Sequence, residues 1–163
     1  MMLKIEELTP QAFAPFGKVI EQPTRPVDAE GPGWKWWGEN LVLGSNRSYA
    51  IGYLDLQPAA LSFNWAERHM HSDELILPTG GDCLIYVGPP DFPNDPAHLP
   101  ALESFRVFRI RQGQGALVSE RVWHGAPMAI DRSLYVVILL GYGSGREDAY
   151  VVKFETNPIC IDR

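Results

Sequence analysis

The sequence contains no long hydrophobic run. Its longest apolar stretch is the seven residues 134–140, whereas a membrane-spanning helix needs about 20 such residues. The first residues do not place a basic segment ahead of an apolar one, so no secretory signal is visible. We therefore expect a cytoplasmic protein that has no membrane partner.

Cysteine is scarce as well. The chain has only Cys83 and Cys160, which could form one disulfide at most. Because the expected compartment is reducing, both are predicted to be free thiols.

Basic residues are outnumbered by acidic ones. The chain has 14 Lys and Arg residues and 20 Asp and Glu residues, which gives a net charge of −6 and a pI near 5.1. This balance argues against nucleic acid as a partner. It is compatible with a small anionic ligand held by a few local arginines.

What the sequence does contain is typical of one globular domain rich in turns. A chain of 163 residues fits a single domain, 1–163. Its 15 glycines and 14 prolines favour turns over long helices. One short helix is predicted within residues 8–13, where Thr9 is a suitable N-cap and Pro10 takes the first helical position.

Elsewhere the pattern is that of β-strands and loops. Strand-like runs lie at 18–21, 48–56, 75–78, 83–87, 104–110, 116–119, 134–140 and 150–154. The turn at 79–82 predicts a hairpin between two of these runs. Residues 22–33 and 88–100, which hold eight of the prolines, are predicted to be loops. Many short strands separated by turns indicate an all-β fold, a β-sandwich or barrel with one or two short helices.

Three of the four histidines gather in two short segments. His69 and His71 are one residue apart, so on a β-strand both side chains project from the same face. His124 follows much later in the chain. Two or three histidines with one carboxylate form the layout of a cupin metal site, which suits Fe, Mn, Zn or Ni. The fourth histidine, His98, lies in the proline-rich loop and is predicted to be a surface residue.

Two acidic residues compete for the carboxylate position. Strict alternation from His71 turns Asp73 inward and Glu74 outward, unless a β-bulge re-aims the second side chain. The residue pattern alone leaves both open.

Arginines and tryptophans near these histidines are candidates for binding. Arg68 and Arg121 could clamp a substrate carboxylate, and Trp123 stands next to His124; all three are predicted to bind substrate. A separate cluster at 34–37 contains three tryptophans. It could form a lid, a subunit interface or core packing at a sheet edge.

The segment 8–21, LTPQAFAPFGKVIE, resembles the opening of the ureidoglycolate lyases. Further matches follow in the order and approximate spacing of that family, namely Glu67-Arg68-His69, Leu77-Pro78, Gly113-Gln114-Gly115 and Val122-Trp123-His124. The resemblance extends over essentially the whole chain. It implies a cupin-type β-barrel, a homodimer, and cleavage of ureidoglycolate to glyoxylate and urea in allantoin catabolism.

The resemblance also bears on individual site residues. His69 and His124 match histidines of the family, and Glu74 falls where the family commonly has Gln, which implies Glu74 rather than Asp73 as the acidic pocket residue. His71 departs from the family, which usually has an apolar residue there. This departure makes the pocket more like that of a metal-binding cupin.

The implied substrate is a hemiaminal that carries a carboxylate. Its cleavage needs a base at the carbinol hydroxyl and an acid at the departing nitrogen. His69, Glu74 and His124 are the predicted catalytic residues. A divalent metal ion on these three residues and His71 could bind the carboxylate and hydroxyl.

Two alternative functions stay open at this stage. One is a metal-dependent cupin isomerase or dioxygenase that acts on another small polar acid. The other is a cupin that binds a small molecule without turning it over.

Overall fold

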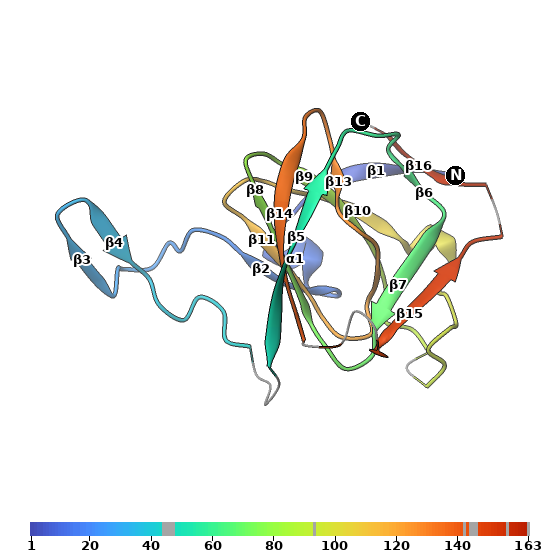
Figure 1. Ribbon diagram of the computed structural model, residues 1–163, viewed down its shortest axis with the longest axis horizontal. Helices are drawn as coiled ribbons and strands as arrows, with labels where there is room; N and C mark the ends of the chain where they lie inside the picture. The colour runs from blue at the N-terminus through green and yellow to red at the C-terminus, as the bar shows by residue number, and fades with distance from the viewer. Residues whose placement is uncertain (44–47, 93, 142, 144–146, 156, 163) are drawn as a thin grey trace.

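Two β-sheets curl around a shared interior in the computed structural model of the chain (Figure 1). The structure describes residues 1–163 except 44–47, 93, 142, 144–146, 156 and 163. Helix in this part of the chain is limited to α1 (Pro10–Phe13) and the 3-10 helix η1 (Leu102–Ser104), and neither could span a membrane. The prediction of an all-β, cupin-type barrel with one or two short helices is confirmed.

The larger sheet has nine strands. Its order is β15 (Ala149–Lys153), β7 (Trp65–His69), β12 (Trp123–His124), β9 (Cys83–Gly88), β10 (Arg106–Ile110), β1 (Met2–Glu7), β16 (Ile159–Asp162) and β6 (Ser62–Phe63), and β13 (Met128–Ala129) pairs with β9. The chain ends meet in this sheet, because β1 pairs in parallel with both β10 and β16.

The smaller sheets complete the architecture. The five-stranded sheet has the order β2 (Gly17–Ile20), β11 (Gly115–Val118), β8 (Glu74–Thr79), β14 (Leu134–Gly141) and β5 (Tyr49–Leu56). Strands β3 (Ala29–Gly31) and β4 (Trp34–Trp36) form a separate two-stranded hairpin.

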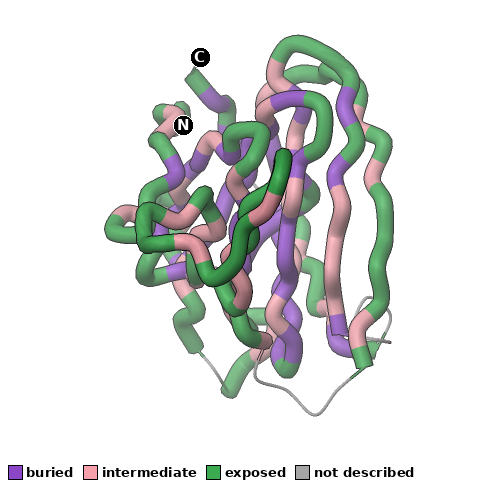
Figure 2. The backbone as a smooth tube through the Cα atoms, turned by 90° about the vertical axis from the view of Figure 1, so that its left-hand side faces the viewer, coloured by how far each residue is buried: buried purple, intermediate pink, exposed green. Residues whose placement is uncertain are grey.

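Buried residues run through the centre of the molecule (Figure 2). Apolar side chains pack in two clusters, one on each face of the nine-stranded sheet. Side chains alternate along β9: Ile85 and Val87 pack in the interior between the two large sheets, whereas Leu84 and Tyr86 belong to a second core on the other face. The interior also takes side chains from the five-stranded sheet, such as Val136. This alternation decides which residues of β7 and β12 can reach the barrel interior.

Most of the predicted local elements are confirmed. In α1 the Ala12 N–H donates to Thr9 Oγ1 at 3.1 Å, as expected for an N-cap. Each predicted strand-like run overlaps an observed strand. The terminal strands β1 and β16 and the short strands β6, β12 and β13 were not predicted. The loop at 88–100 is confirmed within the described residues; Pro93 lies outside them.

The predicted hairpin of the runs at 75–78 and 83–87 is wrong. Strand β8 pairs with β11 and β14, whereas β9 lies in the other sheet. The turn at 79–82 carries the chain from one sheet to the other. A turn signal specifies a reversal of the chain, but long-range contacts choose the pairing partner.

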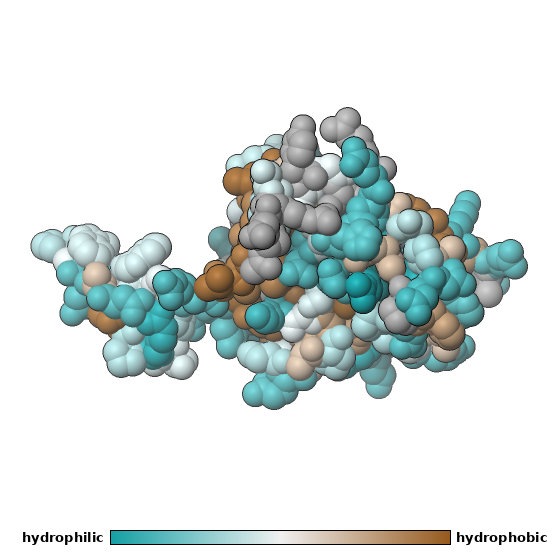
Figure 3. Space-filling model, turned by 90° about the horizontal axis from the view of Figure 1, so that it is seen from below, coloured by the Kyte–Doolittle hydropathy of each residue, from teal (hydrophilic) through white to brown (hydrophobic). Residues whose placement is uncertain are grey.

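The predicted loop at 22–33 is wrong in part, because β3 and β4 form a hairpin that starts within it. This hairpin, hereafter the arm, projects away from the barrel (Figures 1 and 3). Trp34 and Trp36 are 54% and 60% exposed, so they are not core residues. The base of the arm is held by the Arg25–Asp28 ion pair at 2.6 Å.

Candidate active site

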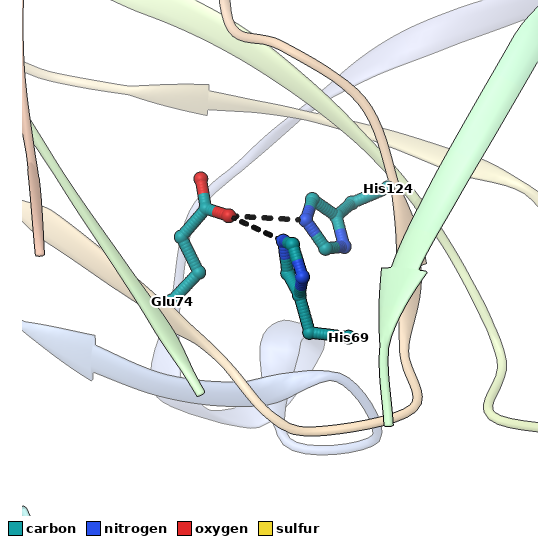
Figure 4. Close-up of side chains that lie close together, drawn as sticks. All are labelled: His69, Glu74 and His124. Atoms are coloured by element: carbon teal, nitrogen blue, oxygen red, sulfur yellow. Dashed lines mark hydrogen bonds and ion pairs between the residues drawn. The ribbon is translucent and has the colours of Figure 1, made fainter. Parts of the chain in front are cut away.

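Two histidines and a glutamate meet in the barrel interior (Figure 4). The Nε2 atoms of His69 and His124 lie 3.2 and 3.3 Å from the same Oε2 atom of Glu74. All three residues are buried. His69 ends β7, Glu74 begins β8 and His124 ends β12, so the cluster joins both large sheets.

The short connection from β7 to β8 is fixed by hydrogen bonds between backbone N–H groups and two aspartate side chains. The N–H groups of Met70 and His71 donate to the two carboxylate oxygens of Asp148 at 3.2 and 2.9 Å. The Glu120 N–H donates to Asp73 Oδ1 at 2.9 Å. These contacts end β7 at His69 and direct the next strand so that Glu74 faces the same interior.

His71, predicted as a fourth metal ligand, lies outside this cluster. The strand ends two residues earlier, so the alternation that placed His69 and His71 on one face does not continue, and the His71 side chain is exposed. Among the described residues the cluster comprises His69, Glu74 and His124 alone. Asp73, the alternative acid, instead binds the Glu120 backbone.

Glu74 and His124 alter each other's pKa, and His69 also contributes to the pKa of Glu74. Burial by itself would raise the pKa of Glu74, but hydrogen bonds from His124 and His69, together with their charges, lower it to about 2. Burial lowers the pKa of His124, but the hydrogen bond and charge of Glu74 outweigh it, and the net pKa of His124 is raised. Glu74 is therefore a carboxylate at neutral pH, and its presence favours protonation of His124.

The residues fit a divalent metal ion. The three ligand atoms lie within 4.8 Å of one another, and two imidazoles with one carboxylate suit Zn, Mn, Fe or Ni. His124 Nδ1 lies 2.9 Å from the Val122 carbonyl oxygen. A proton on Nδ1 would satisfy that carbonyl and leave Nε2 free for a metal, an arrangement common among metal-binding histidines.

A pocket of about 340 Å³ opens onto this cluster. One wall is apolar, and Glu67, His69 and Glu74 supply the acidic and imidazole groups. The lining residues are Gly52, Tyr53, Leu54, Glu67, His69, Glu74, Ala126, Pro127, Ile138 and Leu140. The described residues that line this pocket include no Lys, no Arg and neither of the arm tryptophans.

Arg68 and Trp123, predicted to bind substrate, lie on the opposite face of the sheet. Each precedes a cluster histidine by one residue, so alternation turns it away from the interior. Arg68 is fully buried, and its guanidinium stands over the Trp123 ring, 4.5 Å from the centroid. These two side chains belong to the outer core and not to the pocket.

Arg121 contributes through its backbone. Its N–H donates to the His69 carbonyl at 2.6 Å, which ties the end of β7 to the turn before β12. The Arg121 side chain is partly exposed and lies 3.5 Å from Glu120. It does not line the pocket, so the predicted arginine clamp is not found among the described lining residues.

Glu67 is a pocket residue that the sequence-based prediction missed. It lies two residues before His69 on β7 and opposite His124 in the strand register, so all three side chains share the interior face. The alternation that failed at His71 would have identified Glu67 if applied backwards from His69.

Comparison with known proteins identifies the family. A family model described as ureidoglycolate lyase matches residues 1–161. The ureidoglycolate lyase of Rhodobacter capsulatus is 29% identical over 153 residues, covering 90% of this chain and 91% of that protein. The ureidoglycolate lyase of a Chelativorans species is 29% identical over 154 residues, covering 89% of each chain.

Solved structures support the fold independently. A dTDP sugar isomerase from Desulfovibrio desulfuricans superposes with a TM-score of 0.51 at 16% identity, covering 87% of this chain and 88% of the isomerase. At this identity the likeness concerns architecture alone. The family match, by contrast, spans nearly every residue from β1 to β16. The chain therefore belongs to the ureidoglycolate lyase family.

Proposed function

We propose that this protein cleaves ureidoglycolate to glyoxylate and urea, a step of allantoin catabolism. The observation that carries the proposal is the buried cluster of His69, Glu74 and His124 at a pocket sized for a small molecule, in a chain of this family. The pocket combines an apolar wall with groups that can exchange protons, which is the chemistry that a hemiaminal substrate needs.

The reaction breaks a C–N bond and forms a C=O bond at the same carbon. Removal of the carbinol hydroxyl proton allows a C=O bond to form at that carbon, and the C–N bond breaks with its electron pair leaving on nitrogen. That nitrogen then takes up one proton. The products are the aldehyde of glyoxylate and neutral urea, so the reaction needs proton transfer but no oxidant or reductant.

His69 is the cluster histidine that lines the pocket. We therefore assign to it the removal of the proton from the substrate hydroxyl. Glu74 holds both imidazoles in place through its Oε2 atom. Its hydrogen bond and negative charge raise the pKa of His124, which is not among the described residues that line the pocket. A divalent ion held by these three residues would take the place of the His69 base, since it would polarise the substrate hydroxyl and lower its pKa.

Turnover by matched histidine variants tests this assignment. The purified protein should release urea and glyoxylate in equal amounts from ureidoglycolate. His69→Ala should lower kcat/KM by about 100-fold or more, the effect of removing an acid–base group. His124→Ala should also lower it, because Glu74 loses one of its two imidazole partners. His71→Ala is the matched control and should stay within threefold of wild type. Absence of turnover by the wild type would refute the proposed function.

Metal content is a separate question with its own measurement. We propose that one divalent ion binds per chain, which plasma mass spectrometry of untagged protein would detect. Glu74→Gln should lose the ion and His71→Ala should retain it. Equal metal contents in wild type and Glu74→Gln would contradict this site. Oxygen consumption with bound iron would instead favour the dioxygenase alternative.

We also propose that the chain forms a homodimer through the arm. Trp34 and Trp36 on the arm and Ile51 and Tyr135 on the five-stranded sheet are large apolar side chains that one copy leaves more than half exposed. Strand β5 is the edge of that sheet, and edges need covering. A second copy of this chain supplies both an arm and a sheet face that can cover these side chains. We place this dimer in the cytoplasm.

Light scattering after size exclusion tests the dimer. Wild type should elute at twice its 18.3 kDa mass. The double variant Trp34→Ser/Trp36→Ser should shift to the monomer, whereas Tyr150→Ser, at an exposed aromatic away from the arm, should not. A monomeric wild type would contradict the proposal.

A further inference from the structure

Glu67 is the second carboxylate of the pocket. Its side chain is half-buried and shares the interior face of β7 with His69. Within the described part of the chain it makes no side-chain hydrogen bond or ion pair, in contrast to Glu74, whose Oε2 faces two imidazoles. A half-buried carboxylate without a protein donor keeps both oxygens available to a ligand that displaces water.

The two carboxylates of the pocket differ in their partners. The Oε2 atom of Glu74 faces the imidazoles of His69 and His124, whereas no Lys or Arg is among the described residues that line the pocket beside Glu67. A ligand is therefore disfavoured with an anionic end at Glu67 and favoured with N–H donors there.

We propose that Glu67 binds the ureido group of the substrate, an inference that rests on the proposed function. A monosubstituted urea presents two parallel N–H donors on the side opposite its carbonyl oxygen. Their spacing matches the two oxygens of a carboxylate, so both hydrogen bonds form at once and both are charge-assisted. Glu67 thereby selects a substrate with paired N–H donors and places the hydroxyl-bearing carbon nearer to His69.

The assignment also explains why two glutamates line one small pocket. Glu74 cannot offer both of its oxygens to the ureido group, because its Oε2 faces His69 and His124. Glu67 is held on β7, opposite His124 in the register, at the distance of directly paired side chains, about 5 Å between Cβ atoms. One rigid strand therefore carries both the binding group and the reacting histidine.

Product inhibition tests the proposal, because the two products separate the two ends of the substrate. In Glu67→Gln the amide offers one acceptor where the carboxylate offers two. The KM for ureidoglycolate and the inhibition constant of urea should each rise about tenfold, the loss of one charge-assisted hydrogen bond. The inhibition constant of glyoxylate should stay within twofold. Glu103→Gln, at an exposed glutamate on η1, is the matched control and should change none of these values.

A measurement on the wild type keeps the test independent of variant folding. At non-denaturing concentrations urea should inhibit competitively, whereas tetramethylurea, which has no N–H donor, should not. Equal inhibition by both compounds would overturn the proposal, as would an unchanged urea constant in folded Glu67→Gln. An equal weakening of urea and glyoxylate would also overturn it, since that indicates a general distortion of the pocket. Absence of ureidoglycolate turnover by the wild type would instead refute the proposed function itself.

Discussion

A guanidinium group with no solvent exposure is stable only where its N–H donors find acceptors. Arg68 finds them in the backbone of one loop. Its Nε donates to the Pro96 carbonyl at 3.0 Å and its Nη1 to the Asp91 carbonyl at 2.9 Å, and Nη2 donates to the carbonyls of Phe92 and Asp95. A residue predicted to bind substrate is thus the anchor of an irregular loop.

Replacing this anchor should affect stability and not substrate binding. Arg68→Met leaves the loop carbonyls without donors and should lower the free energy of unfolding by about 3 kcal/mol, as measured by urea denaturation. Arg132→Met, at an exposed arginine, should change it by less than about 0.5 kcal/mol. A raised KM with unchanged stability in Arg68→Met would restore the substrate-binding role.

At the scale of elements, strand β12 depends on the glycine that follows it. A Cβ atom on Gly125 would lie 1.7 Å from the Tyr86 hydroxyl oxygen. Tyr86 has little freedom to move, because its hydroxyl donates to the Trp65 carbonyl at 2.9 Å and its ring stacks on Phe63 with centroids 3.7 Å apart. The close approach of β12 to β9 therefore requires glycine here.

Gly125→Ala should force Tyr86 or β12 to shift. Overpacking of this kind costs about 1–3 kcal/mol of unfolding free energy, which thermal or urea denaturation would detect. Gly52→Ala is the matched control, since a Cβ atom there meets nothing within 4 Å. Equal stability of the two variants would contradict the packing argument.

Another pair of elements is joined through Asp82, just before β9. Its Oδ1 accepts from the Gln112 N–H at 2.9 Å, and its Oδ2 accepts from Arg109 Nε at 2.8 Å. The backbone hydrogen bond, and then the hydrogen bond and charge of Arg109, lower the pKa of Asp82 below its ordinary 3.8 against the opposing effect of burial. The ionised carboxylate thus links the start of β9 to the turn after β10.

The stabilisation by Asp82 should depend on pH in one direction. Because the folded pKa is lower than the unfolded value, the contribution is complete above pH 3.8 and is lost as the pH falls through the folded pKa. Asp82→Asn should therefore lower the unfolding free energy by about 1 kcal/mol at pH 7. Urea denaturation should show this difference narrowing toward pH 3. A difference that grows in acid would contradict the sign.

On the scale of the whole molecule, the His69–Glu74–His124 cluster is a link between the two large sheets. An ion bound there would contact β7 and β12 of one sheet and β8 of the other. Binding to the folded state alone stabilises it, by about 2.7 kcal/mol at a hundredfold excess over Kd. The metal site should therefore control the global stability of the barrel as well as the chemistry of the pocket.

Thermal unfolding of metal-free protein checks this expectation. Added Mn²⁺ or Zn²⁺ should raise the Tm of wild type and of His71→Ala by about 5 °C or more. Glu74→Gln should show no rise. Stabilisation of Glu74→Gln equal to that of wild type would place the bound ion elsewhere.

Local sequence signals were sufficient for much of the fold. Thr9 and Pro10 mark the start of α1, and the alternating apolar runs mark the longer strands, because backbone preferences act over a few residues. His69, Glu74 and His124 were predicted for the site, and the structure brings them together. Signals of this range cannot specify which strands pair, and the turn at 79–82 accordingly joins two sheets rather than two paired strands.

The sequence by itself determined the all-β class, the family and the residue types available for chemistry. Tertiary structure decided which of them share the pocket. Asp148, far along the chain, binds the Met70 and His71 N–H groups, so β7 ends at His69 and the His71 side chain reaches solvent. The same strand direction turns Arg68 outward and Glu67 inward. A strand's end and its buried face are set by contacts with distant segments, and such contacts exist only once the barrel has closed.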